Sequence, residues 1–385
     1  MGWNRAKSMT TELSPEPSMM WCFLTGILSV IIGIVLFMVH ASGIVKELMV
    51  FNVWILSLAP SGIWLFLLCL RGWLWGKEVD KHNFLKKEAD HAQKQWQTWA
   101  ERYLAIAGSS IFLPDSITVG CLHNNFPQQY GLARKIDYLP ASNYPADQSL
   151  RELLKGIKDA LYQLPSELPV KVTLVTDLPD AGLSASFTSV WASLFPDRAI
   201  PDDITITPAF SMAWVEERLK LPVLTVDLIL VMQLCGGDAY SDGLAALLLT
   251  SDDVARKYVL PHPARLLRPM PLDLNKFDED LTLFLETQTI ACRTARVLGD
   301  SCSWETIAAP LMTIGIKHGA GWDPAGRLLL EKWCGIPGPA APWLLTALAA
   351  DLVRLSNTSL LTLFSSGEER FISTVTSGSE NEHNG

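Results

Sequence analysis

Cys121 and His318 are the two residues whose types could carry out chemistry together. A cysteine thiolate is a strong nucleophile, and a histidine can accept and return a proton during acyl transfer. Cys121 stands in the run VGCLHNN, at the end of a predicted strand, and His318 stands in KHGAGW. The two roles require side chains within roughly 3–4 Å of each other, directly or through one water. The alternative interpretations are a small buried hydrophobe at Cys121 and an ordinary loop histidine at His318.

Other motifs that would signal chemistry are missing from the sequence. It contains no phosphate-binding G-x-x-x-x-G-K-[ST], no H-E-x-x-H and no G-x-S-x-G elbow. Its seven cysteines include no C-x-x-C pair, which argues against a zinc ribbon and a redox pair and fits a reducing compartment. Asp238 and Asp242 lie in a glycine-rich turn and could meet a cation, but turn chemistry explains them better. We therefore expect no metal and no cofactor.

Composition points to a membrane and away from nucleic acid. Residues are 49% hydrophobic and 18% charged, and the formal net charge of −9 offers no large basic surface for nucleic acid. The excess apolarity lies in two uncharged runs, at residues 19–39 and about 48–70. Each is long enough to cross a bilayer core of ~30 Å as a helix. Pro60 and Gly62 predict a kink or a loosened turn in the second run.

Basic residues near the ends of the two runs predict their orientation. Arg5 and Lys7 precede the first run, and Lys46 is the one basic residue between the runs. After the second run come Arg71, Lys77, Lys81, Lys86 and Lys87. Because lysine and arginine concentrate on the cytoplasmic side, we expect a multi-pass protein of the bacterial inner membrane with both termini cytoplasmic. The alternatives are a cleaved signal peptide, which the length of the first run disfavours, and a buried helical hairpin in a soluble protein.

The chain is expected to contain five regions. Residues 1–18 form a cytoplasmic tail, 19–70 a transmembrane helical hairpin, 71–107 an amphipathic connecting helix, 108–376 a globular domain and 377–385 a disordered tail. Trp96, Trp99 and Tyr103 follow i, i+3, i+7 spacing, so the connecting helix presents one apolar face that docks on the domain behind it.

Short apolar runs alternate with amphipathic segments in the globular part. Strands are predicted at residues 117–122, 170–175, 222–234, 243–249 and 264–267, with a closing hairpin of residues 360–365 and 370–375. Helices are predicted at residues 149–164, 186–195, 213–219, 253–258, 275–298 and 341–355. This alternation predicts an α/β fold, a layered domain with a mostly buried sheet.

Two stretches resemble the thiolase-like superfamily, which includes the ketosynthases. The run SDGLAALLL at residues 241–249 is similar to a ketosynthase strand, and the closing helix, strand, turn and strand resemble the end of that fold. His318, Gly319 and Gly321 match the H-G-T-G-T loop of that family, whereas Ala320 and Trp322 replace its threonines. The D-T-A-C-S-S nucleophile motif and the second histidine are missing. The resemblance implies a degenerate thiolase-like domain.

Three longer runs resemble a group of enterobacterial membrane proteins found among type VI secretion components. They are HNNFPQQYGL, GGDAYSDGLAALLLTSDDVA and EKWCGIPGPAAPWLLTALAADLVRL, and the resemblance extends over residues 19–376. It implies an accessory protein tied to an envelope-spanning secretion machine and supplies no active-site residues.

Three functions are consistent with these features. We expect a non-catalytic, membrane-anchored accessory or adaptor protein that binds a partner from a secretion machine, or its effector, at the cytoplasmic face. The alternative is a membrane-tethered acyl-transfer enzyme with Cys121 as nucleophile and His318 as acid–base partner. A third possibility is an immunity protein against a membrane-active toxin. The expected partners are the lipid bilayer and a protein, with no role for nucleic acid.

Overall fold

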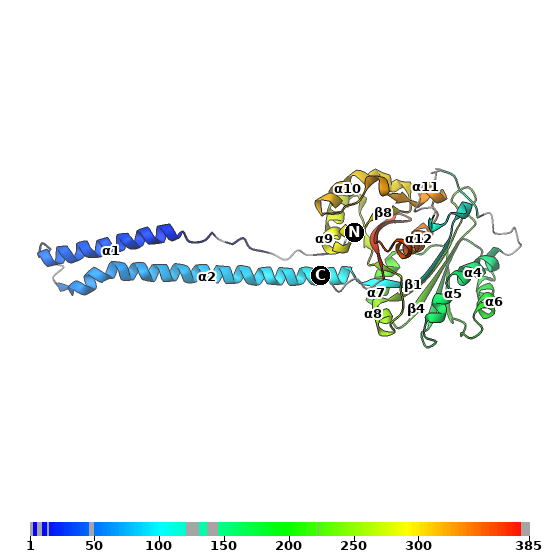
Figure 1. The fold of residues 1–385 in the computed structure, drawn as a ribbon, viewed down its shortest axis with the longest axis horizontal. Coiled ribbons are helices and arrows are strands. Elements are labelled where there is room, and N and C mark those ends of the chain that lie inside the picture. Colours follow the sequence, from blue (N-terminus) through cyan, green and yellow to red (C-terminus); the bar gives the residue numbers. More distant parts are fainter. Residues whose placement is uncertain are drawn as a thin grey trace. The chain divides into compact units, whose positions relative to one another are not determined.

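The computed structural model describes residues 3–5, 10–13, 15–45, 50–120, 131–136, 145–221 and 223–378 of the chain. The chain divides into two compact units. One is Arg5–Gln95, and the other combines Met1–Asn4 with Trp96–Gly385. Figure 1 labels their helices and some of their strands.

The first unit is a helical hairpin. Its helices are α1 (Met19–Ser42) and most of α2 (Val53–Ala100), and both are long and apolar enough to cross a membrane. Helix α1 ends at Gly43, whose φ of 65° allows its N–H to reach the His40 carbonyl oxygen at 3.2 Å. Helix α2 continues through Pro60, so the proline predicted to loosen the helix does not end it.

Small residues bring the two helices of the hairpin close together. A Cβ added at Gly33 would overlap the carbonyl oxygen of Ser57. About two turns towards the N-terminus, Gly26 faces the ring of Trp64, whose Nε1 donates to Thr25 Oγ1 at 3.1 Å. Such close approach and interhelical hydrogen bonding are typical of helices that associate within a membrane.

Within the described residues, eleven strands form one mixed sheet. They are β1 (Tyr103–Phe112), β2 (Val170–Thr176), β3 (Asp203–Thr207), β4 (Val226–Gln233), β5 (Gly243–Ser251), β6 (Ala264–Leu267), β7 (Met270–Pro271), β8 (Arg296–Gly299), β9 (Leu328–Leu329), β10 (Leu360–Ser366) and β11 (Glu369–Ser377). Their order is β3-β2-β4-β5-β1-β6-β11-β10-β8-β9, and β7 pairs with β11.

The sheet consists of two halves with the same topology. In the first half β2 pairs in parallel with β3 and β4, and β5 pairs antiparallel with β4 and β1. In the second half β8 pairs in parallel with β9 and β10, and β11 pairs antiparallel with β10 and β6. The first strands of the two halves, β1 and β6, pair antiparallel and join them. The globular unit is therefore a structural duplication.

Helices cover both faces of each half. The longer helices are α4 (Pro145–Gly156), α6 (Leu183–Leu194), α7 (Ala213–Lys220), α9 (Phe277–Thr287), α10 (Ala308–Lys317) and α12 (Ala341–Ser356). The shorter ones are α5 (Lys158–Gln163), α8 (Asp252–Lys257) and α11 (Leu330–Cys334), with 3-10 turns at Pro114–Ser116, Leu274–Lys276, Thr289–Arg293, Cys302–Ile307 and Pro324–Gly326.

Alternate side chains of the strands enter different cores. In β4, Leu228 and Leu230 pack with α4 and α6, whereas Ile229 and Val231 pack with α7 and α12. In β10, Phe364 faces α12, while Leu363 joins α9 and α10. Helix α12 contacts strands of both halves and is buried along most of its length. It is labelled among the strands of the globular unit in Figure 1. The predicted layered α/β architecture is confirmed, and α7 and α12 form its middle layer.

Two predicted element boundaries are wrong. Residues 103–107 were expected to end a helix, but they begin β1, where Leu104 and Ile106 are fully buried between β5 and β6. Residues 117–120 were expected in a strand and are not, since β1 ends at Phe112; residues 121–122 lie outside the described part of the chain.

The predicted helix over residues 275–298 is three elements. Helix α9 ends at Thr287, a 3-10 turn follows, and Arg296–Gly299 is strand β8 paired with β10. Val297 and Leu298 continue the helical spacing of apolar residues, but both are buried in the sheet as part of β8. Tertiary packing therefore decides their secondary structure. Strand β3 and helix α10 were not predicted from the sequence.

Candidate functional site

The N-terminal ends of the two middle helices meet in an aromatic cluster. It consists of Phe210, which precedes α7, Trp214 in the first turn of α7, and Trp343 in the first turn of α12. Ring centroids are 5.1 Å apart for Phe210 and Trp343, 5.2 Å for Phe210 and Trp214, and 5.9 Å for Trp214 and Trp343. Trp343 is fully buried, and its Nε1 donates to the Phe210 carbonyl oxygen at 2.6 Å.

The polar side chains of the strand-to-helix turn that leads into α7 are hydrogen-bonded within the protein. Ser211 Oγ accepts from the Ala213 N–H at 3.1 Å and donates to Glu369 Oε2 at 2.6 Å. Thr207 Oγ1 donates to the Ala209 carbonyl oxygen at 2.7 Å. These hydrogen bonds fix the conformation of the turn. The Phe210 ring packs between the N-terminal ends of the two helices.

The start of α12 is held by a buried glutamine. Gln233, at the end of β4, accepts from the Ala340 N–H at 3.1 Å and donates to the Ser241 carbonyl oxygen at 2.7 Å. Gly338 lies so close to this side chain that an added Cβ would overlap it. One of the free N–H groups at the start of α12 is therefore bonded within the protein.

His318, the predicted acid–base residue, lies at the C-terminal end of α10. Its backbone N–H donates to the carbonyl oxygens of Ile314 and Gly315 at 3.1 and 3.0 Å, so the residue closes a helix. Gly319 follows with a φ of 81°, and Trp322 packs over Gly315. The residues of KHGAGW therefore form the C-terminal end of helix α10. The predicted nucleophile, Cys121, lies outside the described residues.

Burial disfavours the thiolate form of the other cysteines of the globular unit. Loss of solvation raises the pKa of the Cys292 thiol, of Cys302 to about 11 and of Cys334 to about 12. It also raises the pKa of Cys235, and the carboxylate of Asp177 adds to the effect. These four side chains are thiols at neutral pH, a form that is a weak nucleophile.

A buried carboxylate that the sequence analysis missed follows strand β8. Asp300 is fully buried and accepts from Trp304 Nε1 at 2.9 Å and from the Ser365 N–H at 2.5 Å. Desolvation raises its pKa to about 6, although these hydrogen bonds favour the ionised form. The residue joins the carboxyl ends of β8 and β10, and its position could have been noticed had β8 been recognised as a strand.

Asp238 and Asp242, in the glycine-rich turn between β4 and β5, do not belong to a cluster that could hold a metal ion in the described part of the chain. Asp242 accepts from the Ile136 N–H at 3.1 Å, while Asp238 belongs to the exposed turn. Asp177, after β2, holds this turn by accepting from the Cys235 N–H at 2.7 Å and the Tyr240 hydroxyl at 3.1 Å. In the part of the chain that the structure describes, no group of three or more His, Cys, Asp or Glu is placed to hold a metal ion.

Comparison with known proteins gives structural similarity at low identity. No protein family model matches the chain, and no curated protein matches it. A type II polyketide ketosynthase, solved with its acyl-carrier protein, is 10% identical with a TM-score of 0.48, covering 72% of this chain and 100% of that chain. An oxazolomycin ketosynthase domain from Streptomyces albus is 11% identical with a TM-score of 0.46, covering 72% and 95%.

A third similar structure is OleA from Xanthomonas campestris. It is 12% identical with a TM-score of 0.45, and the match covers 72% of this chain and 99% of that chain. The similarity is therefore to the thiolase-like ketosynthase fold. At these identities it says nothing about the chemistry of this chain.

Proposed function

We propose that this chain is a non-catalytic adaptor of a type VI-like secretion system, anchored by α1 and α2 in the bacterial inner membrane. Its globular unit binds a protein of the machine, or an effector, at the cytoplasmic face. The observation that carries the proposal is the aromatic cluster of Phe210, Trp214 and Trp343 at the meeting point of the two middle helices.

The aromatic cluster occupies the place where a nucleophile would be activated. A thiolate is stabilised by the N-terminal end of a helix, and the ketosynthase resemblance implies a cysteine in a tight strand-to-helix turn. The turn from β3 into α7 carries Phe210 and Ser211 there, and the hydroxyl of Ser211 is bonded to Glu369. The buried ring of Trp343 fills the adjoining space. This packing supports a non-catalytic role.

The first residues of the chain support the proposed orientation. The ring of Trp3 packs edge-on against Trp99, with centroids 5.2 Å apart, and tilted against Phe284 at 5.6 Å. These contacts support a topology in which the N-terminus and the globular unit lie on the same side of the membrane, as two spans require. The basic residues that flank the hairpin favour the cytoplasmic side.

Crosslinking followed by purification from membranes tests the adaptor role. Cells that express the tagged full chain are crosslinked, the chain is purified, and recovered proteins are identified by mass spectrometry. We expect secretion components or an effector, absent from a control that carries the α1–α2 hairpin on an unrelated domain. Recovery of the same proteins by both baits would contradict the proposal.

A thioester probe tests the competing acyl-transfer role. We expect the wild-type chain and Cys121→Ser to show equally little labelling. Strong labelling of the wild type that disappears in Cys121→Ser and in His318→Ala would contradict the adaptor proposal and support an acyl-transfer enzyme.

A further inference from the structure

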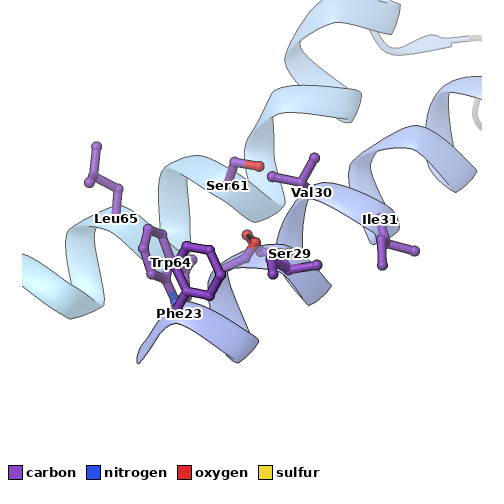
Figure 2. A pocket seen from close by; sticks show the side chains of 9 residues that line it. Phe23, Ser29, Val30, Ile31, Ser61, Trp64 and Leu65 are labelled. Atoms are coloured by element: carbon purple, nitrogen blue, oxygen red, sulfur yellow. Dashed lines mark hydrogen bonds between the residues drawn. The ribbon is translucent and has the colours of Figure 1, made fainter. Parts of the chain in front are cut away.

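A groove runs along the hairpin from its charged end towards its middle. Near the charged end a hollow of about 440 Å³ is lined by Glu16, Phe23, Trp64, Arg71 and Trp75, among others. Deeper in the hairpin a second hollow of about 530 Å³ is lined by Phe23, Gly26, Ile31, Ser61, Trp64 and Leu65. Phe23 and Trp64 line both hollows, so the two hollows adjoin each other along the hairpin. The deeper part is drawn in Figure 2, where Phe23 and Trp64 lie at one end and Ile31 at the other.

The groove has the length of one membrane leaflet. Arg71 is the first charged residue after the second apolar run, and Ser61 lies ten residues before it in α2. Ten helical residues rise about 15 Å, which is half of a hydrocarbon core of ~30 Å. The groove therefore extends from the headgroup level to the middle of the bilayer.

The headgroup end carries one positive and one negative side chain. Among the described residues, neither Arg71 nor Glu16 forms an ion pair, although both line the same hollow. Trp75 lines it too, and its Nε1 is buried without an acceptor in the described part of the chain. A guanidinium and an indole N–H are donors for a phosphate, and a carboxylate accepts from an ammonium group.

We propose that this groove binds one phospholipid of the cytoplasmic leaflet that carries an ethanolamine headgroup. Its phosphate bonds to Arg71 and Trp75, its ammonium group bonds to Glu16, and one acyl chain lies against Phe23 and Trp64. A headgroup with a phosphate and no ammonium leaves Glu16 facing a negative charge, which disfavours phosphatidylglycerol. The proposal rests on the membrane anchoring of the proposed function.

Native mass spectrometry of the full chain tests the lipid site. The protein is purified in a mild detergent, exposed to an equal mixture of phosphatidylethanolamine and phosphatidylglycerol, and its bound lipid is identified. We expect one phosphatidylethanolamine for each chain. Arg71→Gln should lower retention about tenfold, because it removes a charge-assisted hydrogen bond. Glu16→Gln should keep a lipid but lose the preference between the two headgroups.

Matched variants separate the groove from general effects of charge and size. Lys77→Gln removes a cation that is placed over the Trp73 ring, and it should retain lipid like the wild type. Ile31→Trp fills the deep part of the groove, while Ile32→Trp adds the same bulk at a residue that does not line it. We expect the first to lose lipid and the second to keep it.

Two outcomes overturn the lipid site. One is a wild-type chain with no retained lipid or with equal amounts of both headgroups, and the other is equal retention by all variants. Carbonate extraction of membranes keeps the two proposals apart. A chain that stays in the membrane pellet without bound lipid refutes the groove and leaves the anchor intact, whereas release into the supernatant refutes the anchor itself.

Discussion

Trp343 and Phe210 form one contact between the two halves of the duplicated fold. The indole Nε1 donates to the Phe210 carbonyl oxygen at 2.6 Å, and the rings stack with an interplanar angle of 24°. Trp343 belongs to α12 of the second half, and Phe210 precedes α7 of the first. The contact therefore joins the halves at the centre of the middle layer and closes the space between the two helix ends.

Replacing Trp343 should destabilise the globular unit in two separable steps. Trp343→Ala removes a fully buried indole and should lower the free energy of unfolding by about 3–5 kcal/mol. Trp343→Phe keeps most of the packing and loses the hydrogen bond to Phe210, which should cost about 1 kcal/mol. Urea unfolding of the full chain in detergent, followed by tryptophan fluorescence, measures both. A Trp343→Phe variant as stable as the wild type would contradict a contribution from the hydrogen bond.

The N-terminal tryptophan should stabilise the domain on which it packs. Trp3 is buried against Trp99 and Phe284, so Trp3→Ala should lower the free energy of unfolding by about 3 kcal/mol. It should also speed amide hydrogen exchange in α9, which contains Phe284. Trp73→Ala is the control, because Trp73 is exposed and contacts Lys77 in a cation–π pair worth about 1 kcal/mol or less. Unchanged exchange in α9 would refute the docking of Trp3.

Close packing of the hairpin should depend on Gly33. A Cβ at this position overlaps the Ser57 carbonyl oxygen, so Gly33→Leu should push α1 and α2 apart and cost about 1–3 kcal/mol. Gly62→Leu is the matched control, since no atom lies within 4 Å of a Cβ added there. Unfolding by sodium dodecyl sulfate, followed by tryptophan fluorescence, compares the variants. Two identical curves would show that the helices do not meet at Gly33.

Elements with a strong local signal were predicted well from the sequence. The two uncharged runs became α1 and the first part of α2, and the VKVTLV and GLAALLL runs became β2 and β5. The two uncharged runs and GLAALLL are predominantly apolar stretches, whereas VKVTLV begins with the apolar–polar alternation of a strand. Ser366-Gly367-Glu368-Glu369 predicted the hairpin of β10 and β11, in which Gly367 has a φ of 60°.

Elements whose structure depends on contacts between distant segments could not be predicted from local sequence patterns. Tyr103 continues an apolar helical face, yet it starts β1 because β5 and β6 pair with this segment from both sides. The duplication was not predicted either. The two halves share the order and direction of their strands, but the sequence contains no repeated motif that would show it. At the candidate site, Phe210 and Trp343 are 133 residues apart, and neither lies in a motif that marks the other as a neighbour.

The motif-based prediction of His318 shows a related limit. A partial match to a family loop identified a histidine, but the same residues satisfy the requirements of a helix end, which the structure shows them to form. Asp300 had no such motif and was hidden inside a predicted helix. Its burial is visible once β8 is placed beside β10.

Asp300 should make the stability of the domain depend on pH. Its pKa is 3.8 as an ordinary aspartate and about 6 in the fold, where burial disfavours the charge. Between these values the folded state binds the proton more strongly than the unfolded state, so the free energy of unfolding falls as the pH rises from about 4 to about 6. About two pKa units correspond to a loss on the order of 3 kcal/mol, which is complete at pH 7.

Asp300→Asn isolates this effect because an amide does not titrate. Urea unfolding of both full chains between pH 4 and pH 7 gives the difference in stability at each pH, in which contributions from all other groups cancel. We expect the wild type to lose stability relative to Asp300→Asn as the pH rises, by an amount on the order of 3 kcal/mol. The hydrogen bonds to Trp304 and Ser365 shift the whole difference by a constant. A difference that stays the same from pH 4 to pH 7 would mean that Asp300 keeps an ordinary pKa in the fold.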